Sequence, residues 1–201
     1  YHVDAVQAIG KIPIHLEELG IDFLTASAHK FHGPKGIGFL YASSMDFDSY
    51  LHGGDQEQKK RAGTENLAAI IGMVAALKED LEKQEEHFQH VQNLETAFLA
   101  ELEGVQYYQN RGEHHLPYVL NIGFPGQKND LLLLRLDLAG ISISTGSACT
   151  AGIVQSSHVL EAMYGANSER LKESVRISLS PQNTVEDLQT LAKTLKEIIG
   201  G

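Results

Sequence analysis

The sequence predicts an α/β protein whose two parts are joined by a long helical stretch, and three observations support this class. Short apolar runs separated by glycines occupy the first 41 residues, a pattern typical of buried strands and tight turns. From Leu67 to Leu102, apolar residues recur about every 3.5 positions, which is the period of an α-helix. Beyond Gly104, strand-like and helix-like segments alternate, which indicates a second, α+β part.

In the first part, residues 1–5 are expected to end one strand, and residues 23–27 and 36–41 to form two more. A helix-like stretch follows the first strand at residues 5–10. Pro13 prevents it from continuing, because proline disrupts a helix interior. This order of strands around a short helix is typical of an α/β unit.

The helical stretch is expected to begin at Thr64, a residue type that caps helices, and to end near Gly104. It would be about 55 Å long, which exceeds one compact domain and favours a connector between two lobes. The periodicity is compatible with one long bent helix or with two helices in succession. Residues 78–103 carry eight acidic side chains, which favours a solvated helix face; an acidic docking surface is the alternative.

The second part is expected to alternate strands and helices on either side of one loop of small residues. Thr184 and Asp187 form a capping box at the start of the last helix, with aspartate in place of the usual glutamate. The predicted segments are strands at residues 118–122, 141–144 and 174–179, helices at 129–139, 159–164 and 183–199, and the loop at 145–157.

The composition excludes several classes of protein. With 42% hydrophobic residues the chain is too apolar for a disordered protein, and no apolar run approaches the roughly 20 residues of a membrane span. A net charge of −10 argues against direct nucleic-acid binding, and the lone Cys149 excludes an internal disulfide framework. The histidines lack the spacing of metal ligands, so no metal site is expected. Together with the lack of a visible signal segment, these features favour the cytoplasm.

Lys30 is the first candidate for chemistry, because it follows a predicted buried strand and precedes a glycine-proline turn. Burial lowers the pKa of a lysine amine and makes the amine nucleophilic, as Schiff-base chemistry with a carbonyl compound requires. Ser27 and His29 beside it could hold a phosphate group. The alternative is an ordinary surface lysine in a turn.

Asp4 and Gln7 lie three residues apart at the end of the first predicted strand. A carboxylate that faces a pyridinium nitrogen keeps the ring protonated, so that the ring accepts electrons. An amide three residues further on could reach a ring oxygen. The alternative is that Asp4 caps the helix expected after it.

Three further candidates each have an ordinary alternative. Cys149 lies in a predicted loop of small residues, whereas free cysteines are usually buried. An accessible thiolate is a nucleophile. The alternative is a chance loop cysteine. Arg176 is the lone charge in an apolar strand. Its planar guanidinium suits a substrate carboxylate. The alternative is an internal salt bridge with an acidic side chain. Thr64 follows the basic residues 59–61 and would give either an anion site at a helix N-terminus or a plain cap.

Five motifs occur in order over essentially the whole chain. They are HVDAxQ at residues 2–7, SAHKxxGPKG at 27–36, RAGTEN at 61–66, GSACT at 146–150 and VRIS at 175–178. In order and spacing this set closely resembles the cysteine desulfurases, which are pyridoxal-phosphate enzymes of the class V aminotransferase group with the fold type I architecture. The resemblance implies that residues 1–80 are the C-terminal part of the cofactor-binding large domain and that residues 81–201 are the small domain.

The resemblance implies a role for each matching residue around the pyridoxal phosphate cofactor. Lys30 would bind the cofactor covalently. Asp4 would pair with the ring nitrogen, and Gln7 would pair with the ring hydroxyl. Ser27 and His29 would bind the phosphate from their own subunit.

The resemblance also implies partners and an activity. Thr64 would reach the cofactor phosphate of the neighbouring subunit, which implies a homodimer. Arg176 would hold the carboxylate of L-cysteine, and Cys149 would attack the substrate sulfur and carry it as a persulfide. The products would be L-alanine and sulfur delivered to an acceptor protein, an iron–sulfur scaffold or a tRNA-thiolation enzyme.

In the family, roughly half of the chain precedes the Asp4 motif and supplies a ring-stacking histidine, further phosphate contacts and an asparagine for the substrate. This chain starts at Tyr1 without methionine and within a strand-like pattern, so we expect it to be a fragment that is inactive alone. A selenocysteine lyase or another aminotransferase-like enzyme is an alternative, although an aminotransferase needs no nucleophilic thiol. A non-catalytic truncated module that binds a partner is another.

Overall fold

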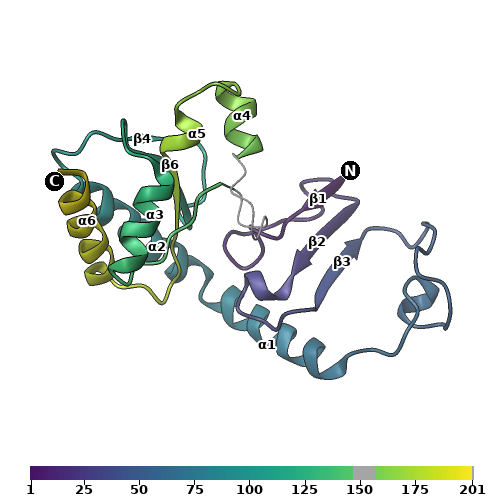
Figure 1. The fold of residues 1–201 in the computed structure, drawn as a ribbon. Coiled ribbons are helices and arrows are strands. Elements are labelled where there is room, and N and C mark those ends of the chain that lie inside the picture. Colours follow the sequence, from purple (N-terminus) through teal and green to yellow (C-terminus); the bar gives the residue numbers. More distant parts are fainter. Residues whose placement is uncertain (147–156, 201) are drawn as a thin grey trace. The chain divides into compact units, whose positions relative to one another are not determined.

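The structure, a computed structural model, describes residues 1–146 and 157–200. It divides the chain into two compact units, Tyr1–Phe88 and Gln89–Gly201, called here the N-terminal and C-terminal units (Figure 1). Each unit contains a three-stranded sheet. In the described part of the chain, no helix combines the length and the apolar character that crossing a membrane demands.

The sheet of the N-terminal unit contains β1 (His2–Asp4), β2 (Phe23–Ser27) and β3 (Gly38–Ala42), in that order. β1 pairs with β2 in parallel, and β2 pairs with β3 antiparallel. Leu24 and Ala26 of β2 are buried and alternate with half-buried side chains, so one face of the sheet is turned to the core. The three predicted strands are confirmed to within two residues at each end.

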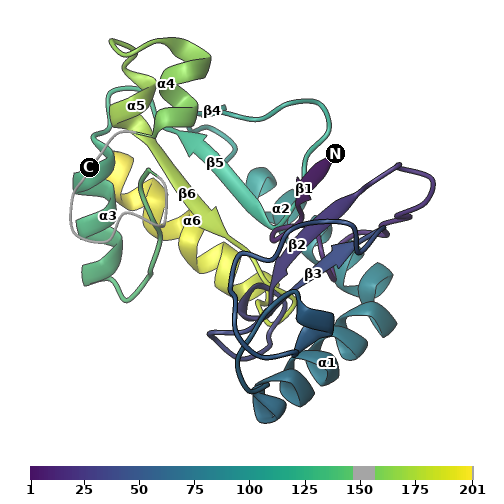
Figure 2. The same ribbon diagram turned by 90° about the vertical axis from the view of Figure 1, so that its right-hand side faces the viewer.

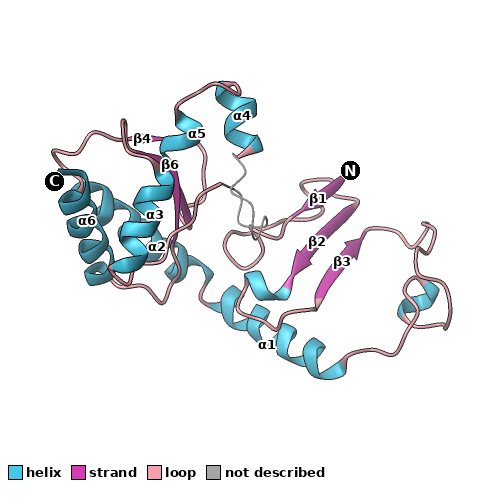
Figure 3. Cartoon of the chain, viewed as in Figure 1, coloured by secondary structure: helices cyan, strands magenta, loops and turns pink. Residues whose placement is uncertain are grey.

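The connection from β1 to β2 contains turns in place of the short helix expected at residues 5–10, and that expectation is wrong (Figure 3). The N–H of Ala8 donates to the carbonyl of Ala5, which begins a turn. Gly10 then has a φ of +76°, outside the right-handed helical region, and Pro13 follows three residues later. The chain therefore leaves the helical conformation after one turn.

Helix α1 (Leu67–Glu82) packs one face onto the N-terminal core. Its buried Met73 belongs to an apolar cluster with Phe31, Ala26 and Ala28. Other large apolar side chains of α1 remain exposed. They are Leu67 (67% exposed), Ile71 (69%), Val74 (43%) and Leu81 (54%).

The long helical stretch consists of two helices in succession, α1 and α2 (Gln84–Glu101). They are separated at Lys83, whose φ of −106° and ψ of 10° are not helical. The first helix begins later than expected, because Asn66 and not Thr64 is its cap. The side-chain oxygen of Asn66 accepts a hydrogen bond from the N–H of Ala69 at 3.2 Å.

Most acidic side chains of this stretch are exposed, as a solvated face requires, but Asp80 and Glu95 are buried. Glu95 of α2 forms ion pairs with Arg111 and His115. A buried carboxylate is tolerated only when such partners offset its loss of hydration. The expectation of a uniformly solvated acidic face is therefore wrong at these two positions.

The sheet of the C-terminal unit is antiparallel, with β4 (Tyr108–Gln109), β5 (Val119–Gly123) and β6 (Ser174–Ser178) in that order. Helix α3 (Asn129–Leu138) packs on β6 and on α6 (Val185–Gly200) (Figure 2). The strand expected at residues 141–144 is reduced to a single bridge between Ser144 and Arg176. Buried apolar residues of this unit include Phe98, Ile122, Leu132, Leu136 and Leu195.

Helices α4 (His158–Tyr164) and α5 (Arg170–Glu173) are held to the start of this sheet by one arginine. The Arg170 guanidinium lies 4.1 Å from the ring centroid of Tyr108 and 4.4 Å from that of Tyr164. It also donates a hydrogen bond to Asn110 at 3.0 Å. Neither β4 nor α5 was predicted, because segments of two and four residues are too short to show a period.

The predicted capping box at the start of α6 is confirmed, and it makes the stability of the C-terminal unit depend on pH. The N–H of Asp187 donates to the Thr184 hydroxyl at 3.2 Å, and the N–H of Thr184 donates to the Asp187 carboxylate at 2.9 Å. The second bond lowers the pKa of Asp187 from its ordinary 3.8. Its stabilising effect is therefore present above pH 3.8 and is lost as the pH falls through the lower, folded value.

Replacing Thr184 with alanine is expected to reduce the free energy of unfolding by about 1 kcal/mol at neutral pH, as measured by urea denaturation. Asp187→Asn should also destabilise the chain at neutral pH, and its penalty should shrink in acid. Thr190→Ala, an exposed change within the same helix, is the control. Equal effects of Thr184→Ala and Thr190→Ala would contradict a capping role.

Candidate functional site

Asp4 and Ser27 close the two parallel strands of the N-terminal sheet, so their side chains start from the same sheet edge. Asp4 is the last residue of β1, Ser27 is the last residue of β2, and the register places Asp4 opposite Thr25. The N–H of Ala5 donates to the carbonyl of Thr25 at 2.9 Å and extends the pairing. Ligands of α/β proteins commonly bind at the carboxyl ends of parallel strands, so this edge is the candidate site.

His29 and Lys30 follow Ser27 at this edge, in the 3-10 helix η1 (Ala28–Lys30). The fully buried Ala28 fixes the turn, because its carbonyl accepts a hydrogen bond from the N–H of Gly33 at 2.9 Å. Lys30 is half-buried and His29 is exposed. Lys30 is thus more shielded from water than an ordinary surface lysine in a turn.

One oxygen of the Asp4 carboxylate is already hydrogen-bonded to the backbone. Its Oδ1 accepts a hydrogen bond from the N–H of Val6 at 3.0 Å, which closes a local turn. A helix cap, the alternative explanation for Asp4, does not apply, because no helix follows. A carboxylate can accept about four hydrogen bonds, so Asp4 keeps the capacity to pair with a ligand.

Lys11 is a residue of this edge that the sequence analysis missed. Its Nζ donates a hydrogen bond to Oε1 of Gln7 at 3.0 Å. Burial lowers the pKa of Lys11, the ammonium of Lys30 lowers it further, and the carboxylate of Asp80 raises it. Lys11 is therefore hydrogen-bonded to Gln7 and lies within the electrostatic influence of Lys30 and Asp80. The four-residue spacing of Gln7 and Lys11 was a signal that could have found it.

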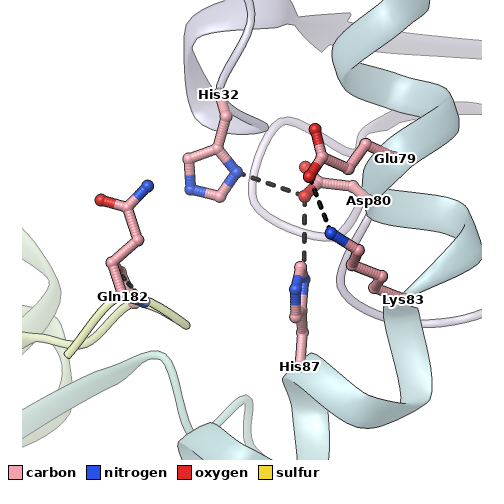
Figure 4. Close-up of polar contacts among 7 residues, drawn as sticks. His32, Glu79, Asp80, Lys83, His87 and Gln182 are labelled. Atoms are coloured by element: carbon pink, nitrogen blue, oxygen red, sulfur yellow. Dashed lines mark hydrogen bonds and ion pairs between the residues drawn. The ribbon is translucent and has the colours of Figure 1, made fainter. Parts of the chain in front are cut away.

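Asp80 is a buried carboxylate behind this edge, only 6% exposed (Figure 4). His32, two residues after Lys30, approaches its Oδ1 through Nδ1 at 3.2 Å, and His87 of α2 approaches the same oxygen at 3.8 Å. Gly10 packs so closely that a Cβ there would lie 3.1 Å from the Cβ of Asp80. Asp80 thus holds the β1–β2 connection, the loop after η1 and the start of α2 together.

Arg176 lies in the C-terminal unit, in the middle of β6. Its backbone N–H donates to the carbonyl of Ser144 at 2.6 Å, and its carbonyl accepts from the N–H of Ser144 at 3.0 Å. No acidic side chain within residues 1–146 and 157–200 pairs with Arg176, and its buried Nε has no hydrogen-bond partner there. These observations disfavour the internal salt bridge that was the alternative explanation.

The two other predicted site residues are Thr64 and Cys149. Thr64 is exposed and lies in the segment that precedes α1, where the cap is Asn66. Cys149 lies outside the described residues. Across the described ranges, no group of three or more histidine, cysteine or acidic side chains could hold a metal ion.

Gly38 sets how closely β3 approaches β2 beside this site. It pairs with Ser27, and a Cβ at Gly38 would lie 2.3 Å from the backbone oxygen of Ala26, closer than any real contact. Gly38→Ala is therefore expected to lower the free energy of unfolding by about 1–3 kcal/mol, because the two strands must separate. Denaturant unfolding measures the change.

Gly112→Ala is the matched control, since the nearest atom to its Cβ would be 3.8 Å away. That variant should retain the stability of the unmodified protein. If Gly38→Ala left the free energy of unfolding unchanged as well, that result would contradict the close approach of β2 and β3 at Ser27.

Comparison with known proteins gives one family and a consistent set of relatives. Residues 1–191 match the family described as aminotransferase class-V. A putative cysteine desulfurase IscS 1 of Bacillus subtilis is 46% identical over 203 residues, which cover 99% of this chain and 54% of that protein. A cysteine desulfurase IscS of Dictyoglomus turgidum is 39% identical and is covered over 51% of its length.

Solved structures agree with these relatives. A NifS-like protein superimposes on 99% of this chain with a TM-score of 0.87 at 36% identity. A NifS-like protein from Rickettsia africae also gives a TM-score of 0.87, at 32% identity over the whole chain. The chain covers 52% and 53% of those two structures. It therefore spans about half the length of the curated relatives and structures that it matches.

Proposed function

This chain belongs to the class V aminotransferase family, and from that premise we propose that it is part of a cysteine desulfurase, which takes sulfur from L-cysteine and leaves L-alanine. The observation that carries the proposal is the sheet edge that bears Asp4 and Lys30, with Gln7 bonded to Lys11 beside them. Similarity to desulfurases along 99% of the chain supports it. Because the chain spans about half of those relatives, the activity is proposed for the full-length protein.

Pyridoxal phosphate fits the donors at this edge. Its aldehyde requires an amine, which the half-buried Lys30 offers. Its ring nitrogen requires a carboxylate, and Asp4 has acceptor capacity beyond its bond to Val6. Its ring oxygen requires a donor, which Gln7 supplies through its amide nitrogen while its amide oxygen is bonded to Lys11.

Each of these residues then has a defined task. When bound, the cofactor draws electrons away from the Cα of the substrate. Nζ of Lys30 takes the proton that Cα releases, because a free lysine amine is a base. Asp4 holds the proton at the ring nitrogen, and Ser27 and His29 bind the phosphate through a hydroxyl and an imidazole.

The sulfur step uses Cys149 and Arg176. Arg176 binds the substrate carboxylate with its planar fork, which supports a fixed orientation. The Cys149 thiolate attacks the substrate Sγ, so a sulfur–sulfur bond forms and the substrate carbon–sulfur bond breaks. The electron pair of the broken bond stays on the substrate carbon, which takes up a proton and becomes the methyl group of alanine, and Lys30 returns a proton to Cα.

We also propose the domain assignment of the family for this chain. Residues 1–80 would belong to the cofactor-binding large domain and residues 81–201 to the small domain that carries Cys149. The compact unit Tyr1–Phe88 supports a boundary in this region. Alone, the 201 residues would be inactive, because further cofactor and substrate contacts would come from the remainder of the full-length protein.

The partners follow from the same proposal. The full-length protein would form a homodimer in which Thr64, exposed ahead of α1, reaches the cofactor phosphate of the neighbouring subunit. Sulfur would pass to an acceptor protein of iron–sulfur cluster assembly, for which the IscS names of the relatives give support, or to one of tRNA thiolation. The proposed location is the cytoplasm.

The test is to supply the full-length protein with pyridoxal phosphate and L-cysteine and to measure alanine, sulfide and the mass of Cys149. Equal amounts of alanine and released sulfur, with a persulfide on Cys149, are expected. Pyruvate or an amino-group transfer product would identify another reaction of the family. Much faster turnover of L-selenocysteine than of L-cysteine would identify a selenocysteine lyase.

A further inference from the structure

We propose that Lys11 is a positioning residue that fixes the amide of Gln7 so that its NH2 group faces the ring oxygen of the cofactor. The proposal rests on the proposed function and deepens it. The resemblance that suggested Gln7 assigns no role to Lys11. Lys11 is thus a further residue of the candidate site.

The backbone brings the two side chains together. Gln7 and Lys11 lie four residues apart in the turns after β1, where the N–H of Lys11 donates to the carbonyl of Ala8 at 3.0 Å. Gly10 is buried and has a φ of +76°, which few other residues adopt. Its lack of a side chain lets the turn lie against Asp80. The segment is therefore fixed by packing before any ligand binds.

The hydrogen bond at 3.0 Å decides which end of the Gln7 amide points to Lys11. An ammonium group has three donors and no acceptor, so only the amide oxygen can face it. The amide nitrogen is then directed to other groups as a donor. Without Lys11, the amide oxygen could turn toward the ring oxygen, and the fixed donor would be lost.

The surroundings explain why a charged lysine can stay in this half-buried position. Asp80 provides the compensating negative charge and is itself held by His32 and His87 (Figure 4). Its carboxylate favours the charged form of Lys11, whereas burial and the charge of Lys30 disfavour it. Glu79, the neighbour of Asp80 in α1, accepts a hydrogen bond from Lys83 at 2.9 Å.

The experiment follows the absorbance of pyridoxal phosphate bound to the full-length protein during a pH titration. In Lys11→Met, whose unbranched side chain is one atom shorter and has no donor, the midpoint should move to higher pH by about one unit. A ring oxygen without its donor carries more negative charge, so it holds the proton shared with the Lys30 nitrogen more tightly. Lys11→Arg keeps a donor and should restore the original midpoint.

A double-mutant comparison separates positioning from a simple effect of charge. Gln7→Leu should give the same shift alone, and Lys11→Met added to Gln7→Leu should give no more. Gln7→Glu should also shift the midpoint, because a carboxylate accepts from Lys11 but offers no donor to the ring. Lys35→Met removes an exposed charge from the loop after η1 and should leave the midpoint unchanged.

Two results would overturn the proposal. One is an unchanged midpoint in Lys11→Met. The other is an equal shift from Lys11→Met with and without Gln7, which would mean that Lys11 acts on Lys30 as a charge. If the unmodified protein bound no pyridoxal phosphate, the proposed function itself would fail. Should Lys11→Met not fold, Lys11→Leu takes its place, since leucine also lacks a donor and the proposal requires the same shift, again absent when Gln7 is already leucine.

Discussion

Replacing Lys30 with alanine is expected to lower cysteine turnover by the full-length protein by about 10²–10⁴-fold, the usual contribution of a positioned acid or base. The variant loses the amine that takes the proton from Cα. It also loses the covalent attachment of the cofactor, so the absorbance of bound pyridoxal phosphate should change as well. Alanine formation from L-cysteine and the absorbance spectrum measure the two effects separately.

Lys35→Ala is the matched control for Lys30→Ala, because it removes an exposed lysine from the same motif. It should retain both turnover and spectrum. Turnover by Lys30→Ala within about tenfold of the unmodified protein would show that another group acts as the base. The half-buried position of Lys30 at this sheet edge would then have no catalytic explanation.

Replacing Cys149 with alanine is expected to lower sulfur release by at least about 100-fold, because the nucleophile is lost. Cys149 is the lone cysteine among the 201 residues, so sulfur from labelled L-cysteine should no longer attach to this part of the protein. Arg176 and Lys30 are unchanged in the variant. The absorbance of the bound cofactor should therefore still respond to added L-cysteine.

The control for Cys149→Ala is Ser142→Ala, an exposed change ahead of the same segment that leaves the thiol in place. It should behave as the unmodified protein. Normal sulfide release by Cys149→Ala would exclude Cys149 as the nucleophile. The cofactor chemistry at Lys30 would remain possible, and a different thiol would have to be sought.

Longer segments of the fold were predictable from sequence because their side-chain periods are strong. The strand Phe23–Ser27 and the helices around residues 130–138 and 185–199 lie where the pattern of apolar residues places them. One error arose where a local bond overrides the pattern. Asn66 displaces Thr64 as a cap because its side chain reaches the N–H of Ala69.

The site was predictable in part, because a motif names residue types but not their partners. Asp4 and Lys30 could be singled out, since both end strands or begin turns in the sequence. For Lys11 the sequence offers only its four-residue spacing from Gln7, which shows neither the bond to Gln7 nor the buried charge of Asp80. Asp80 itself looked like one more acid on a solvated helix, since its two histidines come from elsewhere in the chain.

The exposed apolar side chains of α1 affect the solubility of this chain. Leu67 and Ile71 are among its most exposed apolar residues, and contiguous apolar surface promotes association of molecules in solution. The net charge of −10 opposes that association through mutual repulsion. Salt shortens the range of the repulsion and leaves the apolar attraction in place. A high salt concentration, often used to keep proteins soluble, is therefore expected to promote aggregation of this chain. A buffer of low ionic strength is the better choice for storage.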